Sequence, residues 1–338
     1  MYNTFKYVNK LSYIFKKPRK FRELMTKTKK ISQPKVSIVF VTWNGKDYTF
    51  DLIDSLRKID YKNYDIIVVD NGSTDGTQRE FKKKYKKVAT IIENGKNLGL
   101  AEGLNVGIRE GLRRNSKYVL VMNNDMIVKK DFLNYLVDSM EKHPEVSVSG
   151  PKMYFFEPKN MIYGAGCDYH MHGFRARHTW EIDVGQADEE KYVDEIDCVL
   201  MMRSDVLRKC GLFESRFFLF HELTEWCLRT KKLGYKCWYA PKAVLWHKES
   251  VSPAFEGTRN ERERATYYMT RNWLLTIRKN KNYLYYLMIL FLQSTAFAFV
   301  RFAKFLKHKQ FYLVKIYYIA IWHALINKTP MKLYPYKK

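Results

Sequence analysis

The residues with the clearest chemical potential follow directly after short apolar runs. One run ends at Val69 and continues as DNGSTD, residues 70–75, and another ends at Met122 and continues as NND, residues 123–125. The first stretch offers acceptors for nucleoside hydroxyls or a base N–H, and donors for phosphate. Asp125 offers a carboxylate suited to a hard cation, Mg²⁺ or Mn²⁺. Either stretch could instead form an ordinary Asx-type turn.

Buried strands have to position these side chains. Four short runs rich in Val and Ile have the continuous apolar pattern of strands covered on both faces: 35–42, 64–70, 88–92 and 117–122. Helical patterns follow them: 47–58, 76–86, 100–112 and 131–142, the last with Asp131 as the expected N-cap. This alternation predicts an α/β fold with a mostly parallel sheet. Ligands bind beyond the carboxyl ends of such strands, so the polar stretches should meet at one edge.

The second half of the sequence is less regular. Residues 151–203 mix glycines, aromatic residues and short apolar runs, which predicts a partly antiparallel extension. A helix is expected from Thr224 to Leu233, ending at Gly234. The pattern over 237–247 predicts a strand, a proline turn and a second strand.

Two common nucleotide-binding motifs do not occur. After the first predicted strand, TWNGKD has one glycine and a bulky tryptophan where a G-x-G-x-x-G loop would approach a pyrophosphate, and the sequence has no Walker A motif. This disfavours a Rossmann oxidoreductase. Four glycines recur every fourth residue on one helical face: Gly99, Gly103, Gly107 and Gly111. Charged residues between them argue against a membrane GxxxG contact and favour close packing of a helix on the sheet.

Positive charge is concentrated at the two ends of the chain. Of the net charge of +25, residues 1–35 contribute +10 and residues 271–338 contribute +13. The central body is close to neutral, which disfavours a nucleic-acid-binding face. Because the basic C-terminal region is also rich in aliphatic and aromatic residues, we expect it to contact an anionic membrane surface.

The uncharged segment 282–300 is just long enough to span a bilayer. A span would carry Arg301, Lys304 and Lys307 across the membrane, against the positive-inside bias. A helix lying in the membrane interface fits better, and a buried core helix is the alternative. Five cysteines without a CxxC pair, and the lack of an apolar signal segment, indicate a reduced cytosolic protein. We therefore expect a peripheral protein on the cytoplasmic face of the cell membrane.

Six blocks, in this order and at these spacings, resemble one enzyme family: VSIVFVTWNG (36–45), IIVVDNGSTDGT (66–77), NLGLAEGLNVGI (97–108), VLVMNND (119–125), GLFESRFFLFHELTEWCLRTKKLGY (211–235) and YAPKAVLWHKESVS (239–252). Together they are similar to the family 2 inverting glycosyltransferases with the GT-A fold. The resemblance is strongest to the bacterial branch that builds surface polysaccharides, including rhamnosyltransferase-like members. It covers roughly 36–250, and YYMTRNW (267–273) is similar to a segment that follows in these enzymes.

The resemblance implies roles for residues that match the family's motifs. Thr42 and Asn44 match the first-strand tip that lies against the nucleotide. Asp70 matches the acid that holds the ribose or the base. Asn97 and Gly99 match the block near the base. The implied donor substrate is a nucleotide-diphospho-sugar.

The resemblance also implies a metal site for Mg²⁺ or Mn²⁺. The family's D-x-D motif corresponds to residues 123–125, so Asp125 is the expected metal ligand and Asn123 is expected beside the donor. Asn123 replaces the first acid, which leaves one carboxylate for the metal. His247 matches a late histidine that completes the metal or diphosphate site in several relatives.

The catalytic base is where this sequence departs from the family. Relatives carry an acidic pair at the start of the helix near residue 222, and its second acid is taken as the base; here Leu223 follows Glu222. Inverting transfer needs a carboxylate that accepts the acceptor's proton. Glu222 is the first candidate and Glu225, one helical turn later, the second. Either acid could instead only favour the helix N-terminus.

The expected organisation is a basic arm at 1–35, a GT-A domain at 36–255 and a membrane-associated helical region at 256–338. The expected activity is sugar transfer from a nucleotide-diphospho-sugar to a glycan acceptor in cell-surface polysaccharide synthesis. We expect this acceptor to be lipid-linked. A catalytically silent membrane-bound scaffold, or a basic nucleic-acid-binding protein, is the alternative. None of the motifs specifies an oligomeric state.

Overall fold

Four parallel strands form the first half of a mixed sheet: β1 (Val36–Thr42), β2 (Tyr64–Asp70), β3 (Thr90–Glu93) and β4 (Tyr118–Met122). The computed structural model describes residues 33–170, 173–248 and 258–327, and the residues from Pro34 onward belong to one compact unit. β1 and β4 are almost completely buried, as expected of strands that are covered by helices on both faces. These four strands confirm the predicted parallel sheet.

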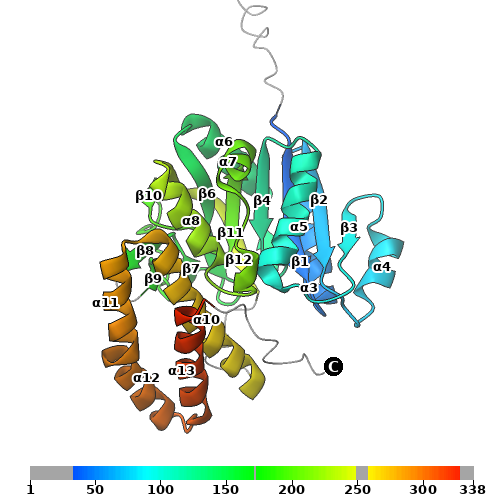
Figure 1. Cartoon of the computed structure of the whole chain (residues 1–338). Helices are drawn as coiled ribbons and strands as arrows, with labels where there is room; N and C mark the ends of the chain where they lie inside the picture. Colours follow the sequence, from blue (N-terminus) through cyan, green and yellow to red (C-terminus); the bar gives the residue numbers. More distant parts are fainter. Residues whose placement is uncertain (1–32, 171–172, 249–257, 328–338) are drawn as a thin grey trace, which may run out of the picture. The chain divides into compact units, whose positions relative to one another are not determined.

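The second half of the chain adds shorter and longer strands: β5 (Met126–Val128), β6 (Val146–Phe155), β7 (Ile162–Gly164), β8 (Cys167–His170), β9 (Gly173–Ala176), β10 (Lys191–Val193), β11 (Val199–Arg203) and β12 (Lys236–His247). The main sheet has the order β10-β12-β6-β11-β4-β1-β2-β3, with β5 beside β12 and β7 beside β6 (Figure 1). β11 runs antiparallel to both of its neighbours, which confirms the predicted partly antiparallel extension. β8 and β9 form a separate hairpin.

The prediction for residues 237–247 needs a correction. β12 is one continuous strand, not a strand, a proline turn and a second strand. Its pairing with β6 shifts between Ala240 and Val244, so Pro241 lies in an irregularity of the ladder. A proline has no N–H to donate, and an irregular position accommodates it without ending the strand.

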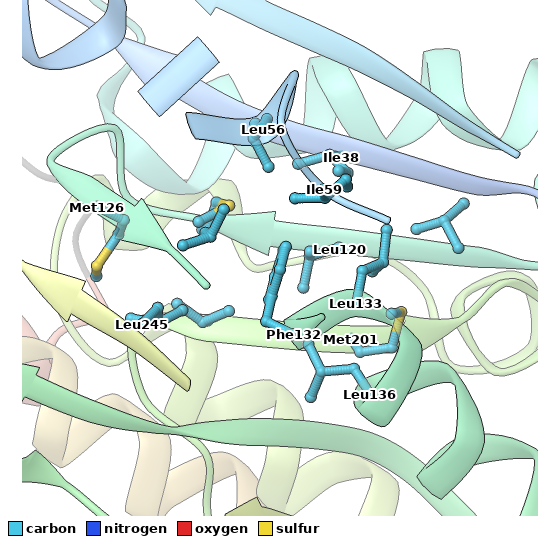
Figure 2. Close-up of a cluster of buried hydrophobic side chains, with 14 of the residues drawn as sticks. Ile38, Leu56, Ile59, Leu120, Met126, Phe132, Leu133, Leu136, Met201 and Leu245 are labelled. Carbon is cyan, nitrogen blue, oxygen red and sulfur yellow. The ribbon is translucent and has the colours of Figure 1, made fainter. Parts of the chain in front are cut away.

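Helices cover both faces of the sheet. One face carries α3 (Lys46–Leu56), α4 (Thr77–Lys84) and α6 (Phe132–Lys142), and the other carries α5 (Gly99–Arg113), α7 (Ser204–Cys210) and α8 (Glu222–Lys232). Figure 2 shows the first of these cores, where Ile38 and Leu120 of the sheet meet Leu56 and Phe132 of the helices. Asp131 lies at the N-cap of α6 as predicted, although its side chain makes no capping hydrogen bond.

The glycines of α5 let this helix approach the sheet closely. A Cβ atom added at Gly107 would lie 2.2 Å from Val39 of β1, and one added at Gly111 would lie 2.9 Å from Ser37. Real Cβ atoms are not found at such distances from other heavy atoms, so the helix could not sit at this depth with alanine. The predicted packing on the sheet is confirmed for Gly103, Gly107 and Gly111, whereas a Cβ atom at Gly99 would meet Phe218 and not the sheet.

Among the described residues, the helices that follow the sheet are α10 (Arg259–Asn280), α11 (Tyr283–Ser294), α12 (Ala296–Lys307) and α13 (Tyr312–Leu325). They share an apolar core and lie beside one another, yellow to red in Figure 1. Tyr283–Lys307 is the one stretch among the described residues that is long and apolar enough to cross a membrane, although its helix is interrupted at Thr295. The predicted boundary at 255 lies outside the described residues.

The alternative of a buried core helix over 282–300 is wrong. α11 buries only Tyr286, Ile289 and Gln293. Leu284 is 79% exposed and Phe291 is 66% exposed, so much of the apolar surface of this helix lacks cover by the described residues.

Candidate active site

The predicted polar stretches meet at one edge of the sheet. Thr42, the last residue of β1, pairs with Asp70, the last residue of β2. Met122 ends β4, and Val199 at the start of antiparallel β11 pairs with it. β12 brings His247 to the same edge, where it pairs with the first residue of β5. Segments that lie far apart in the sequence therefore supply side chains to one place.

Asp70 is fully buried, and its two carboxylate oxygens have different surroundings. Its Oδ1 accepts hydrogen bonds from the backbone N–H groups of Gly72 and Ser73 and from Gln78 Nε2, at 2.7–3.0 Å. These bonds build the turn after β2, which was one of the two sequence interpretations. Its Oδ2 is buried and has no hydrogen-bond partner among the described residues. A buried acceptor without a partner is costly, so this oxygen is a candidate ligand atom.

The other residues that are predicted to lie near the nucleotide mostly make hydrogen bonds within or between loops. Thr42 Oγ1 accepts a hydrogen bond from Thr49. Asn44 Oδ1 accepts one from the N–H of Thr74. Asn97 Oδ1 accepts the N–H of Gly99, the first residue of α5. The structure thus brings these side chains to the sheet edge, where they join the loops after β1, β2 and β3.

Two pockets adjoin at this edge and share Leu100, Leu219 and Phe220 in their walls. The first, of about 300 Å³, is lined by Asn123, Asp125, Tyr163, Glu195, Asp197, Cys198, His221, Glu222, Leu223, Thr224 and His247. The second, of about 380 Å³, is lined by Val41, Trp43, Asn71, Asn97, Gly99, Asn124, Phe218, Glu261, Arg264 and Ala265. Of the residues predicted to bind ligand, the first pocket collects Asn123, Asp125, Glu222 and His247.

Asp125 and His247 form the candidate metal site. Their Oδ1 and Nε2 atoms lie 3.3 Å apart, but neither atom makes a hydrogen bond of good geometry with the described residues. Both side chains are buried. One carboxylate oxygen and one imidazole nitrogen suit a divalent cation, so these residues fit such an ion. The described part of the chain has no cluster of three or more such ligands.

Glu222 begins α8 and lines the first pocket. It is 3% exposed, and its Oε2 has no hydrogen-bond partner among the described residues. Burial raises the pKa of Glu222 to about 7, with a smaller increase from the charge of Asp197. A carboxylate with this pKa can accept a proton near neutral pH.

Glu225 is held differently. Its carboxylate is fully buried and forms ion pairs with Arg229 at 3.0 Å and with Lys279 of α10 at 3.2 Å. It is not among the residues that line either pocket. The structure therefore separates the two candidate acids, one in the first pocket and one in a salt-bridge network.

Sequence reasoning missed two acids of the first pocket, Glu195 and Asp197. They lie just before antiparallel β11, whose start reaches the same edge as the ends of the parallel strands. Burial raises the pKa of Glu195 well above its ordinary value, and its Oε1 bonds the Thr224 hydroxyl at 2.6 Å. The available signal was the acidic stretch DEID directly before the apolar run CVLMM.

Comparison with known proteins gives a consistent result. Residues 37–211 match the model of the family described as "Glycosyl transferase family 2". The chain is 25% identical over 247 residues to dTDP-rhamnosyl transferase RfbF of Shigella flexneri, covering 72% of this chain and 79% of that one. It is 25% identical over 238 residues to N-acetylglucosaminyl-diphospho-decaprenol L-rhamnosyltransferase of Mycobacterium tuberculosis, covering 64% and 76%.

A solved structure shares the fold. The mannosyltransferase PcManGT from Pyrobaculum calidifontis, in complex with GDP-Man and Mn²⁺, aligns with a TM-score of 0.54 at 16% identity, covering 88% of this chain and 89% of that one. At this identity the likeness concerns the arrangement of the elements. It agrees with the predicted GT-A fold.

Proposed function

The chain belongs to glycosyl transferase family 2, and from this membership and the geometry of its pockets we propose an inverting transfer of a sugar from a nucleotide-diphospho-sugar to a glycan acceptor of cell-surface polysaccharide synthesis. One observation carries the proposal. The carboxylate of Glu222, with an unpartnered oxygen, lines the same pocket as Asp125 and His247. Inversion needs a base and a leaving-group site on opposite sides of one sugar ring, and this pocket offers a candidate for each.

The second pocket is our proposed nucleoside site. Asp70 lies at the same sheet edge without lining this pocket, and its buried Oδ2, which has no donor among the described residues, would accept a hydrogen bond from the ribose or the base. Asn97 and Gly99 would form part of the wall around the nucleoside, and Thr42 and Asn44, which do not line this pocket, would hold the loops beside it. Asn123, in the first pocket, would lie beside the sugar. The Shigella relative is named a dTDP-rhamnosyl transferase, so dTDP-rhamnose is the first donor to test.

Glu222 is the proposed catalytic base. In its ionised form it takes the proton from the attacking hydroxyl of the acceptor, and that oxygen forms the new bond to the anomeric carbon. The bond between the anomeric carbon and the diphosphate breaks on the opposite face, and Glu222 ends protonated. Glu225 is the weaker candidate because two cations already engage its carboxylate.

Asp125 and His247 are the proposed ligands of Mg²⁺ or Mn²⁺. When bound, the cation supplies positive charge that neutralises the departing diphosphate. The contact between Oδ1 and Nε2 and the burial of both side chains support this assignment. A Mn²⁺ ion and GDP-Man are named in the complex of the structural neighbour PcManGT.

We further propose that the acceptor is lipid-linked and that the enzyme is peripheral on the cytoplasmic face of the cell membrane. The Mycobacterium relative is named for an acceptor linked through a diphosphate to decaprenol. On this chain, exposed apolar side chains lie on α11, α12 and α13, among them Leu284, Phe299 and Trp322. The same region is rich in lysine and arginine, which suits anionic headgroups.

The test is turnover of a panel of UDP-, dTDP- and GDP-sugars by the full-length chain, with membrane extract as the source of acceptor. Mg²⁺ or Mn²⁺ is present in one arm and chelated in the other. We expect one donor to be consumed, and only with the cation present. No turnover of any donor in either arm would favour the silent scaffold.

A further inference from the structure

The loop that delivers Glu222 to the pocket has an uncommon backbone. It follows a short 3₁₀ helix at Ser215–Phe217 and ends at His221, the N-cap of α8. Phe218, Phe220 and His221 have φ values of 64°, 66° and 65°. Positive φ is uncommon for bulky side chains, and such residues persist only where their surroundings hold them. The surroundings of this loop therefore matter for the position of Glu222.

Asn272 of α10 makes the central contact with this loop. Its Nδ2 donates to the carbonyl oxygens of Phe217, Leu219 and Phe220, at 2.8, 2.8 and 3.0 Å. Asn272 is completely buried. Arg271 Nη1 donates to Asn272 Oδ1 at 2.7 Å, which turns the NH₂ group toward the loop. The two N–H bonds of this one NH₂ group thus face three carbonyl oxygens of the loop, of which that of Phe217 also accepts the N–H of Leu219.

Neighbouring residues of α10 hold the same loop. The ring of Tyr268 stacks on Phe218 at 5.4 Å. The imidazole of His221 hydrogen-bonds to the backbone of Met269. Phe217 is buried in the apolar core of the C-terminal helices, not in the core of the sheet. The loop is therefore anchored to α10 by its backbone and by its side chains.

The loop in turn forms part of the sugar-nucleotide site. The Phe218 carbonyl accepts the N–H of Leu100 at 2.6 Å, in the first turn of α5. Leu219 and Phe220 line both pockets. A shift of the loop would change the walls of both pockets and the start of α8 together.

We propose that Asn272 is a positioning residue for the transfer reaction, which holds the loop Phe217–His221 so that Glu222 stays at a fixed place in the first pocket. This inference rests on the proposed function, because it assigns Asn272 a role through the proposed base. It also gives Asn272 of α10 a role in the geometry of the site, beside the membrane contact proposed for the C-terminal helices.

The ionisation of Glu222 supplies a readout that a purely structural role would leave unchanged. Its pKa of about 7 is caused mainly by burial, so a loosened loop that admits water should bring it back toward 4.5. The titratable or charged residues that line the pocket with it are Asp125, Glu195, Asp197, Cys198, Tyr163, His221 and His247. None of these is changed by a substitution at position 272.

The experiment compares Asn272→Ala with wild type, using the full-length chain and the donor that wild type accepts from the panel above. We expect kcat to fall by roughly 10- to 100-fold while the KM for the donor changes by less than about 3-fold. The midpoint of the acid limb of the kcat profile should move from about 7 toward lower pH. Asn260→Ala, at an exposed position of the same helix, is the matched control and should behave as wild type.

Three outcomes are distinguishable. If wild type turns over no donor, the proposed function fails. If wild type is active and a folded Asn272→Ala keeps its kcat, or loses kcat without a shift of the acid limb, the positioning role fails and the proposed function stands. If Asn272→Ala does not fold, Asn272→Ser, which keeps one donor, is measured by the same two readouts, with an intermediate loss and shift expected.

Discussion

At the scale of single residues, Glu222 has two properties that oppose each other. Burial without a hydrogen-bond partner for Oε2 raises its pKa to about 7, which makes it a usable base. The same burial means that the folded state prefers the protonated form. Because the folded-state pKa lies above the ordinary value of 4.5, this stabilising preference is complete below pH 4.5 and is lost as the pH rises through 7.

Glu222→Gln should therefore stabilise the protein at pH 8. The amide carries no charge to desolvate, so we expect the free energy of unfolding to rise by up to about 3 kcal/mol. At pH 4, where the wild-type carboxyl is already protonated, the two proteins should be equally stable. Denaturant unfolding at both pH values is the measurement. A destabilisation that is larger at pH 8 than at pH 4 would mean that Glu222 makes a favourable ionic contact instead.

Glu225→Gln should act on stability and not on chemistry. The substitution leaves Arg229 and Lys279 without their shared carboxylate, and we expect a loss of about 1–2 kcal/mol in the free energy of unfolding. Asp138→Asn, which removes an exposed ion pair with Lys142, is the matched control and should cost less than about 0.5 kcal/mol. A loss for Glu225→Gln no larger than that of the control would contradict the structural role.

At the scale of elements, strands and helices are predicted best where a single physical requirement determines which residue types occur in them. Strands that are buried on both faces need continuous apolar runs, and β1, β2 and β4 were predicted within a residue or so. Close packing of α5 needs small residues at every fourth position, and the glycines supply them. Both patterns are local, so periodicity alone reveals them.

Other features of the site depend on contacts between distant segments. Glu195 and Asp197 reach the pocket only because β11 inserts antiparallel beside β4, a pairing that no local pattern encodes. The loop Phe217–His221 takes its backbone from bonds with Asn272, more than fifty residues later. The conformational preferences of bulky aromatic residues do not predict positive φ values in this loop. These parts of the site required the structure.

Gly107→Ala tests the packing of α5. The new Cβ atom would lie 2.2 Å from Val39 Cγ1, so helix and strand must move apart. Overpacking costs typically 1–3 kcal/mol, and the better helix propensity of alanine returns up to about 1 kcal/mol. We expect a net loss of at least about 1 kcal/mol in denaturant unfolding. Arg109→Ala, at an exposed position of the same helix, should change stability by less than about 0.5 kcal/mol.

At the scale of the whole molecule, charge and apolar exposure coincide in the C-terminal helices. The composition predicts a basic, lipid-facing region, and the structure leaves apolar side chains of α11, α12 and α13 exposed. Asn272 and Lys279 connect this region to the loop and helix that carry the two candidate acids. The proposed membrane contact and the geometry of the candidate active site are thus linked through α10.

Vesicle binding should follow from this surface. Full-length protein should cosediment with vesicles that contain anionic phosphatidylglycerol more than with neutral phosphatidylcholine vesicles, and less at high salt. Leu284→Glu should weaken binding by roughly 10-fold, because it removes an inserted apolar side chain and adds a negative charge. Val184→Glu, at an 85% exposed apolar position before β10, is the matched control. Equal binding by both variants would exclude α11 from the membrane contact.

The central claim is that Glu222, not Glu225, acts as the base opposite a cation held by Asp125 and His247. Divalent-dependent sugar transfer by wild type, Asp125→Ala, Glu222→Gln and Glu225→Gln tests it most directly. We predict that one nucleotide-sugar is turned over, that Asp125→Ala and Glu222→Gln each lose at least about 100-fold in kcat, and that Glu225→Gln stays within about 3-fold of wild type. An inactive Glu225→Gln beside an active Glu222→Gln would contradict the account.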